Sequence, residues 1–325
     1  MTFGSAMDLL LSIGALGLTI GILFPATRIY LRWRKGDDEE KHELEKAFYL
    51  TYSAVVIILG IRLFLIPLYF WTMQGFVPMI PGAMCLWGVF NALPELTWGS
   101  LFLKLVVPVA YIGWLLLSQI NGKCKTHPLM QNMMAFFIVI APLVLLDSAA
   151  DIFTFSRMTP VQVNCCSDAI DVGVRPIPIL IGGVSGQVIL LAVFFLLAAL
   201  LALSLFLASK HRAAHWAALA LSLPVGGILV LTITEALTPW LLRLPFHHCP
   251  FCLFFLHPLA ILFTGLIWFA LATPWLTWIT SRLGRENEES KENETQLRKT
   301  LHTYSGIALI IALTLMAVDL FITFA

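Results

Sequence analysis

Long apolar runs recur along the whole of this 325-residue chain, and they limit its possible folds more than any other feature. Crossing the roughly 30 Å hydrocarbon core of a bilayer takes about 20 helical residues. Eight runs are long enough, at residues 8–32, 47–71, 100–120, 131–153, 178–208, 214–242, 254–280 and 303–325. They lack the alternation of β-barrel strands. We therefore predict an all-α, polytopic integral membrane protein, with about eight transmembrane helices in one transmembrane domain over residues 1–325.

The composition excludes several other classes of protein. Hydrophobic residues make up 59% of the chain and charged residues only 12%, which is more apolar surface than a soluble core of this size can bury. Twenty lysines and arginines face nineteen aspartates and glutamates, so the net charge is +1 and no nucleic-acid-binding basic face is expected. A soluble dinucleotide-binding enzyme and a disordered scaffold are excluded as well, and the lipid bilayer is the first predicted partner.

Basic residues gather in every second connection between the runs. The connections after the first, third, fifth and seventh runs, with their flanks, hold 14 lysines and arginines, whereas the opposite side holds three. Lys and Arg accumulate in cytoplasmic loops, so both termini are predicted outside the cytoplasm, with charged cytoplasmic loops at 33–46 and 281–302. Mixed Glu and Lys in these loops favour helical extensions of the runs that follow. The bacterial inner membrane, with a periplasmic outer face, is the predicted location.

Cysteines are concentrated on the side predicted to be extracytoplasmic, in loops 72–99, 154–177 and 243–253. These loops hold, in order, Cys85, then Cys165 and Cys166, then Cys249 and Cys252, and only Cys124 falls on the cytoplasmic side. All three extracytoplasmic loops contribute, and such loops can meet above a helical bundle. This asymmetry is the strongest functional signal in the sequence.

The Cys249-x-x-Cys252 pair favours redox chemistry. It lies at the start of the run 254–280, where helix N–H groups and the neighbouring His248 favour a thiolate, and Cys249 is the predicted attacking sulfur. A lipid-soluble quinone at the membrane interface can accept electrons from such a pair. In this motif the chain resembles the DsbB and VKOR membrane thiol oxidoreductases, which place a cysteine pair at a periplasmic helix end next to quinone. The resemblance implies disulfide or electron transfer with a periplasmic thiol protein, and it covers this motif only.

The same loops also permit a metal site. His247, His248, Cys249 and Cys252 offer four donors within six residues, and thiolate with imidazole suits copper or zinc. Two methionines near Cys85 add soft thioethers. The sequence therefore leaves open a soft-metal (copper-like) binding or transport protein. A structural zinc ribbon is disfavoured, because adjacent cysteines do not supply a second spaced pair.

A third alternative assigns the cysteines no chemistry. Loops in an oxidising compartment often carry structural disulfides, which would leave a non-catalytic membrane subunit. The five extracytoplasmic cysteines are an odd number, so at most two disulfides can close among them.

Ionisable residues inside the runs are costly, by about 2.5–3.5 kcal/mol each at the membrane centre on insertion scales. Asp147, Asp151, Glu235, Arg62 and Lys104 all fall in the outer halves of their runs. We expect an outward-facing polar vestibule beneath the cysteine loops, in which the carboxylates accept protons or guide cations. Alternatively, Asp147 or Asp151 pairs with Arg62, and Glu235 with Lys104, to hold the bundle together.

The run 214–242 carries two further features. Pro224, followed by Gly226 and Gly227, predicts a kink or an unwound turn. His211 and His215 lie four residues apart at its inner end, and we interpret them as polar residues flanking a span rather than as ligands.

Overall fold

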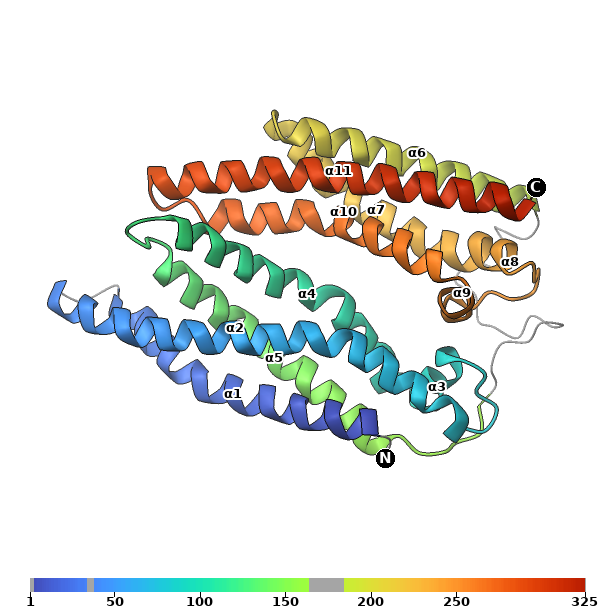
Figure 1. The fold of residues 1–325 in the computed structure, drawn as a ribbon, viewed down its shortest axis with the longest axis horizontal. Helices are drawn as coiled ribbons and strands as arrows, with labels where there is room; N and C mark the ends of the chain where they lie inside the picture. Colours follow the sequence, from blue (N-terminus) through green and yellow to red (C-terminus); the bar gives the residue numbers. More distant parts are fainter. Residues whose placement is uncertain (1–2, 34–37, 164–183, 325) are drawn as a thin grey trace. The chain divides into compact units, whose positions relative to one another are not determined.

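The computed structural model describes residues 3–33, 38–163 and 184–324, and every regular element within them is helical (Figure 1). The long helices are α1 (Phe3–Trp33), α2 (Asp38–Gly75), α4 (Pro94–Lys123), α5 (Met130–Arg157), α6 (Val184–Ala208), α7 (Arg212–Thr232), α10 (Pro258–Leu283) and α11 (Glu288–Phe324). The short elements are η1 (Val77–Met79), α3 (Leu86–Ala92), η2 (Ile233–Leu237), α8 (Thr238–Leu241) and α9 (Pro250–Leu256).

Eight spans in the described residues are long and apolar enough to cross a membrane, and each corresponds to one predicted run. The all-α, multi-pass prediction is therefore confirmed, while the outward orientation of both termini stays a prediction. Helices α2 and α11 begin at Asp38 and Glu288, inside the predicted charged loops, as the mixed Glu and Lys pattern suggested. Side chains such as Phe24 and Leu50, 75% and 78% exposed, give the spans an apolar outer surface suited to lipid.

The predicted loop 72–99 is largely helical. Helix α2 continues to Gly75, the single turn η1 and helix α3 follow, and α4 already begins at Pro94. Proline is well placed in the first turn of a helix, because the amide that it lacks has no partner there. The loop prediction was therefore too long at both ends.

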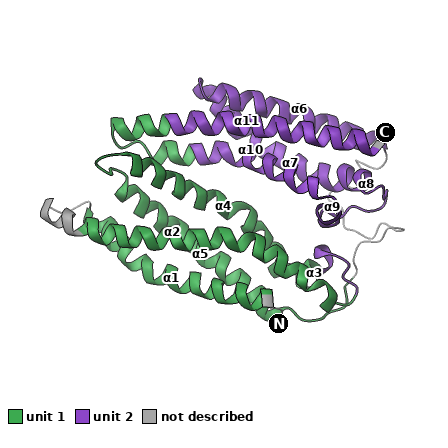
Figure 2. Cartoon of the chain, in the orientation of Figure 1, with its two compact units in different colours: residues 1–81, 89–163, 278–295 green, residues 82–88, 164–277, 296–325 purple. Residues whose placement is uncertain are grey.

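Contacts divide the chain into two compact units (Figure 2). Unit 1 comprises residues 1–81, 89–163 and 278–295, and unit 2 comprises 82–88, 164–277 and 296–325. Each unit has its own packed interior. The single-domain organisation stays a prediction.

Unit 1 is built mainly from α1, α2, α4 and α5. Helix α1 packs against α5 and α2, and α4 packs against α5. Trp114 of α4 is fully buried, stacks on Tyr52 of α2 at 5.7 Å between ring centroids, and donates its indole N–H to the Met133 carbonyl of α5 at 2.9 Å. Buried aromatic rings with a satisfied polar atom thus hold these helices together.

Unit 2 surrounds an apolar core to which α6, α7, α10 and α11 all contribute. Its fully buried members include Phe194 of α6, Val225 of α7, Phe263 of α10 and Leu309 of α11. A Cβ atom at Gly306 of α11 would lie 2.9 Å from the ring of Phe206, so glycine permits a close approach of α11 and α6. Small residues serve this purpose in membranes, where lipid is as apolar as the core.

The span that begins with α7 ends irregularly. Helix α7 continues through Pro224 to Thr232, and the chain then widens into the π-helical turn η2 before α8. The Thr238 hydroxyl donates to the Ile233 carbonyl at 2.7 Å across this turn. The unwound turn predicted at Pro224 thus falls instead at η2, which contains the buried Glu235. Single π-helical turns of this kind are frequent at functional sites.

Candidate thiol site

Cys85 lies at the end of a tight turn in unit 2, directly before α3. Gly82 adopts φ = 83°, a left-handed conformation that favours glycine, and this turns the chain after Pro81. The Cys85 carbonyl accepts a hydrogen bond from the Gly88 amide at 3.0 Å, which fixes Cys85 at the start of the helix. Its side chain is buried, with 5% of the residue exposed.

Cys249 and Cys252 lie on the short helix α9. Cys249 is the N-cap residue, Pro250 occupies the first helical position, and the Leu253 amide donates to the Cys249 carbonyl at 3.3 Å. Helix α9 ends at Leu256, with His257 as its C-cap, because a proline disfavours helical geometry at the residue before it, and Pro258 then begins α10. The predicted position of Cys249 at the start of the spanning helix is therefore corrected to the start of a separate seven-residue helix.

The three cysteines form one cluster. The Sγ atoms of Cys85 and Cys249 are 3.4 Å apart, and those of Cys85, Cys249 and Cys252 all lie within 4.8 Å of one another. Sulfurs bound to one ion through bonds of about 2.3 Å are separated by at most about 4.6 Å. The cluster could therefore hold a metal ion after only small movements. Cys165 and Cys166, which were predicted to join it, lie outside the described residues.

The two predicted histidine ligands are not members of this cluster among the described residues. Nδ1 of His248 lies 3.0 Å from the Thr234 carbonyl and 3.7 Å from a carboxylate oxygen of Glu235. His247 is buried, with 6% of the residue exposed. The histidine next to Cys249 is thus held against η2, beside the carboxylate of Glu235.

Cys124 provides a contrast to the cluster. It is buried in unit 1, where its Sγ lies 3.3 Å from the Ile120 carbonyl and 3.5 Å from the Asn293 amide nitrogen. Burial raises the pKa of the Cys124 thiol. Because the thiolate is the reactive form, this environment suits an inert thiol.

The predicted intramembrane charges form a network in unit 1. Nε of Arg62 donates to Asp147 at 3.0 Å, and Nη2 pairs with both Asp147 and Asp151, the latter at 2.9 Å. Nζ of Lys104 lies 2.6 Å from Asp147 and 2.8 Å from Asp151. All four side chains are almost completely buried.

The predicted pairing of the aspartates with Arg62 is thus observed, and Lys104 pairs with the same two aspartates. The alternative pairing of Lys104 with Glu235 stays a prediction. Glu235 belongs to unit 2, so its convergence with Asp147 and Asp151 stays a prediction.

Sequence reasoning missed two groups of polar residues. Asp8 and Ser12 of α1 extend the charged network, but Asp8 opens the first apolar run and therefore resembles a flanking residue. His302 of α11 is fully buried, with its Nε2 3.4 Å from Nδ1 of His215. His215 is thus part of a buried pair rather than a flank, whereas His211 is exposed as predicted.

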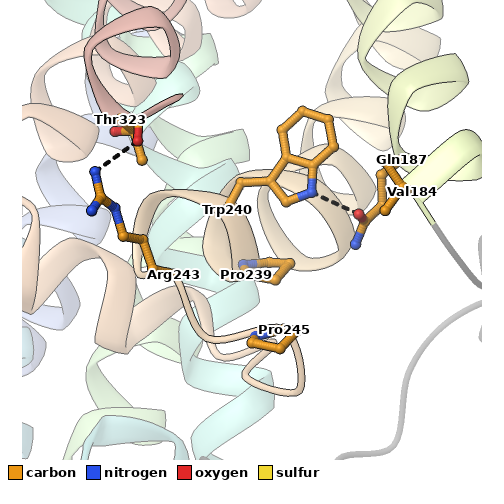
Figure 3. Close-up of a pocket in the computed structure, with 7 residues that line it drawn as sticks. All are labelled: Val184, Gln187, Pro239, Trp240, Arg243, Pro245 and Thr323. Carbon is orange, nitrogen blue, oxygen red and sulfur yellow. Dashed lines mark hydrogen bonds between the residues drawn. The ribbon is translucent and has the colours of Figure 1, made fainter. Parts of the chain in front are cut away.

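Unit 2 also contains a pocket of about 370 Å³ (Figure 3). It is lined by Val184, Gln187, Pro239, Trp240, Arg243, Pro245 and Thr323. The Trp240 indole donates to Gln187 at 2.6 Å, and Arg243 donates to the Thr323 carbonyl at 2.7 Å, as Figure 3 shows. Arg243 adopts φ = 57°, a conformation that is uncommon outside glycine.

No protein family, curated protein or solved structure matches this chain. The fold and the cluster therefore define its class on their own: an integral, multi-pass membrane protein with a compact site of three cysteines.

Proposed function

We propose that the protein is a membrane thiol oxidoreductase whose working site is the cluster of Cys85, Cys249 and Cys252. The observation that carries this proposal is the 3.4 Å separation of Cys85 Sγ and Cys249 Sγ, beside the Cys249-x-x-Cys252 pair. Three sulfurs at this spacing can exchange a disulfide among themselves. Cys85 and Cys249 are 164 residues apart in the chain, so the fold adds a third thiol to the Cys249–Cys252 pair.

The reaction proceeds by thiol–disulfide exchange. A thiolate of a periplasmic dithiol protein attacks Cys249 Sγ, the Cys249–Cys252 bond breaks, and Cys252 leaves as a thiolate. The second thiolate of the partner attacks the mixed disulfide and releases Cys249. The partner has then lost two electrons and gained a disulfide. A lipid-soluble quinone takes two electrons and two protons from the reduced pair and restores its disulfide.

Cys85 gives the disulfide a second position. Its thiolate can attack Cys249 Sγ and displace Cys252, which moves the disulfide to Cys85–Cys249 without any net oxidation. His248 precedes Cys249 in the chain and has Glu235 3.7 Å from its Nδ1, and in this proposal the two side chains accept the proton of the attacking Cys85 thiol.

Substitution of Cys252 tests this function. Because exchange is reversible, Cys249 in a Cys252→Ser protein attacks the disulfide of an oxidised partner and remains in a mixed disulfide. Cys85 can resolve this mixed disulfide to an internal Cys85–Cys249 disulfide, with release of the reduced partner. We expect a reductant-sensitive adduct on non-reducing gels, identified by mass spectrometry, and none in the matched Cys124→Ser protein. An abundant Cys252→Ser protein without any adduct and with unchanged thiol chemistry would exclude the proposal.

A soft-metal site is the second candidate, and the spacing of the three sulfurs within 4.8 Å favours it. Thiolates select Cu(I) or zinc, and the cluster would then bind or pass on such an ion. In this case the reduced, purified protein contains copper or zinc by elemental analysis, and Cys85→Ser or Cys252→Ser lowers the metal content without any trapped adduct. A metal-free reduced protein that still forms the adduct supports the redox function.

We further propose that both termini and the cysteine cluster face the periplasm of a bacterial inner membrane, on the basis of the biased Lys and Arg distribution. Met84, 75% exposed beside Cys85, and Lys291, exposed at the start of α11, provide test positions. A membrane-impermeant maleimide on intact cells should label Met84→Cys above the parent protein, and Lys291→Cys only after permeabilisation. The reverse pattern would invert the topology.

A further inference from the structure

The charged network inside unit 1 contains three carboxyl groups but only two cationic side chains. Arg62 and Lys104 each contact both Asp147 and Asp151, so these four side chains balance one another. Asp8 of α1 adds a third carboxyl and is fully buried. An ionised Asp8 would leave an excess negative charge in the interior of the bundle, where an unbalanced charge is expensive.

Asp8 reaches the network through Ser12, one turn later in α1. Ser12 Oγ lies 3.3 Å from Oδ1 of Asp8 and 3.4 Å from Oδ2 of Asp151. Arg62 Nη1 donates to the same Ser12 oxygen at 3.2 Å. The other carboxyl oxygen of Asp8, Oδ2, is buried and has no hydrogen-bond partner among the described residues.

The hydrogen-bonding capacity of Ser12 distinguishes the two states of Asp8. A hydroxyl group donates one hydrogen bond and accepts two. If Asp8 carries a proton on Oδ1, Ser12 accepts from Asp8 and from Arg62 and donates to Asp151, and all three contacts are satisfied. If Asp8 is ionised, the Ser12 hydroxyl can donate to only one of the two carboxylates. The oxygen of the other carboxylate then faces Ser12 Oγ with no proton between the two oxygens.

The remaining groups around the network do not compensate an ionised Asp8. Helix α2 contributes Arg62 and the Tyr69 ring, α4 contributes Lys104 and Tyr111, and α5 contributes Asp147 and Asp151. Both cations are already engaged by the two aspartates of α5, and Tyr111 Oη lies 3.4 Å from Asp147. The Nζ atom of Lys104 lies over the Tyr69 ring, 5.1 Å from the ring centroid.

We propose that Asp8 is a proton-binding site, which holds a proton at neutral pH and exchanges it with Asp151 through Ser12. In the transfer, the Asp8 proton moves to Ser12 Oγ while the Ser12 proton moves to Asp151, so that Asp8 becomes ionised and Asp151 neutral. The site needs no cysteine and is independent of the proposed thiol chemistry. Intramembrane carboxyls with exchangeable protons are characteristic of proton relays in pumps and transporters.

Infrared spectroscopy of the full-length protein in lipid nanodiscs tests this proposal. At pH 7, about three pH units above the ordinary pKa of aspartic acid, the wild-type protein should show the carbonyl band of a protonated carboxyl, with a shift in D₂O. Asp8→Asn should lose one carboxyl equivalent of this band. Asp319→Asn, which removes a carboxyl paired with His257 at 2.7 Å, should keep it. Ser12→Ala should keep the band but slow its exchange in D₂O.

The stability of Asp8→Asn provides the second measurement. A neutral amide replaces a neutral acid of the same shape, so the melting temperature should stay within about 2–4 °C of wild type. An unchanged carbonyl band in Asp8→Asn would overturn the proposal, and so would failure of this variant to fold, since both would indicate an ionised Asp8. If Na⁺ but not choline raises the melting temperature of the wild-type protein, and Na⁺ has no such effect on Asp8→Asn, the site binds a metal cation instead of a proton.

Discussion

The charged network of unit 1 and the thiol cluster of unit 2 are built from different parts of the fold. Four long helices supply the network, and each of its cations contacts two carboxylates. A turn and the start of a seven-residue helix supply the thiols, and Cys252 is only partly buried. Disulfide exchange requires sulfurs 3.4 Å apart to close to about 2.05 Å and separate again. Short connecting elements allow such movement, whereas side chains fixed between long helices suit ion pairs and proton transfers that need no movement of the backbone.

The largest expected effect on the free energy of unfolding comes from removing a cation from the network. Arg62→Met leaves two buried aspartates with only Lys104 as a partner, and breaking a buried ion pair typically costs about 3–5 kcal/mol. We expect a loss of that size in the free energy of unfolding, measured in detergent, and poor recovery of monodisperse protein. The exposed Lys291→Met is the control and should change the free energy by no more than about 0.5 kcal/mol.

A compensating change sharpens this prediction. In Arg62→Met with Asp147→Asn, one cation and one anion are removed together, so the remaining Lys104 and Asp151 balance. The double variant should be more stable than Arg62→Met alone. If it is less stable, the network acts through packing rather than through charge balance.

A smaller effect is expected from the ion pair of unit 2. His257 Nε2 lies 2.7 Å from Asp319, but the histidine side chain is 29% exposed, so water screens the interaction. Asp319→Asn should therefore cost no more than about 1 kcal/mol in the same unfolding measurement. A loss as large as that of Arg62→Met would remove the distinction between a buried network and a partly exposed pair.

The same contrast explains which features the sequence could predict. The spans followed from length and apolarity, because lipid leaves a helix few alternatives. The meeting of the aspartates with Arg62 followed from depth alone. The pairing of Lys104 with both aspartates was missed, because depth does not reveal which helices within unit 1 are neighbours. Asp8 was missed because a carboxyl at the start of an apolar run resembles a solvated end, although α1 actually begins at Phe3.

The thiol site was predicted in part. The sequence singled out Cys85 and the Cys249–Cys252 pair, and the structure brings these sulfurs together. It did not indicate that α9 is separate from α10, although Pro258 carried that signal, since the residue before a proline disfavours helix. The direction of His248 toward η2 could not be predicted, because it depends on a π-helical turn with no sequence signature.

Removal of one thiol should have little effect on stability. Cys85→Ser exchanges sulfur for oxygen in a turn, so we expect a change of less than about 1 kcal/mol in the free energy of unfolding. Chemistry should respond much more strongly, because the disulfide loses its second position on Cys249. In a Cys252→Ser background, Cys85→Ser should abolish the internal Cys85–Cys249 adduct and leave only adducts with a partner protein on non-reducing gels. An unchanged adduct pattern would show that Cys85 takes no part in the disulfide exchange.

The smallest effect concerns Cys124, where neither fold nor function should change. Its thiol is buried and its pKa is raised, so the thiolate appears only at higher pH than for an ordinary cysteine. Alkylation by iodoacetamide, followed by mass spectrometry, should therefore be slow at pH 8 and accelerate as the pH is raised further, until the thiolate is fully formed. After unfolding, Cys124 should react at the rate of an ordinary thiol. If native Cys124 reacts at pH 8 as fast as reduced Cys252, burial does not control thiol reactivity in this chain, and the contrast between an inert thiol in unit 1 and a working cluster in unit 2 fails.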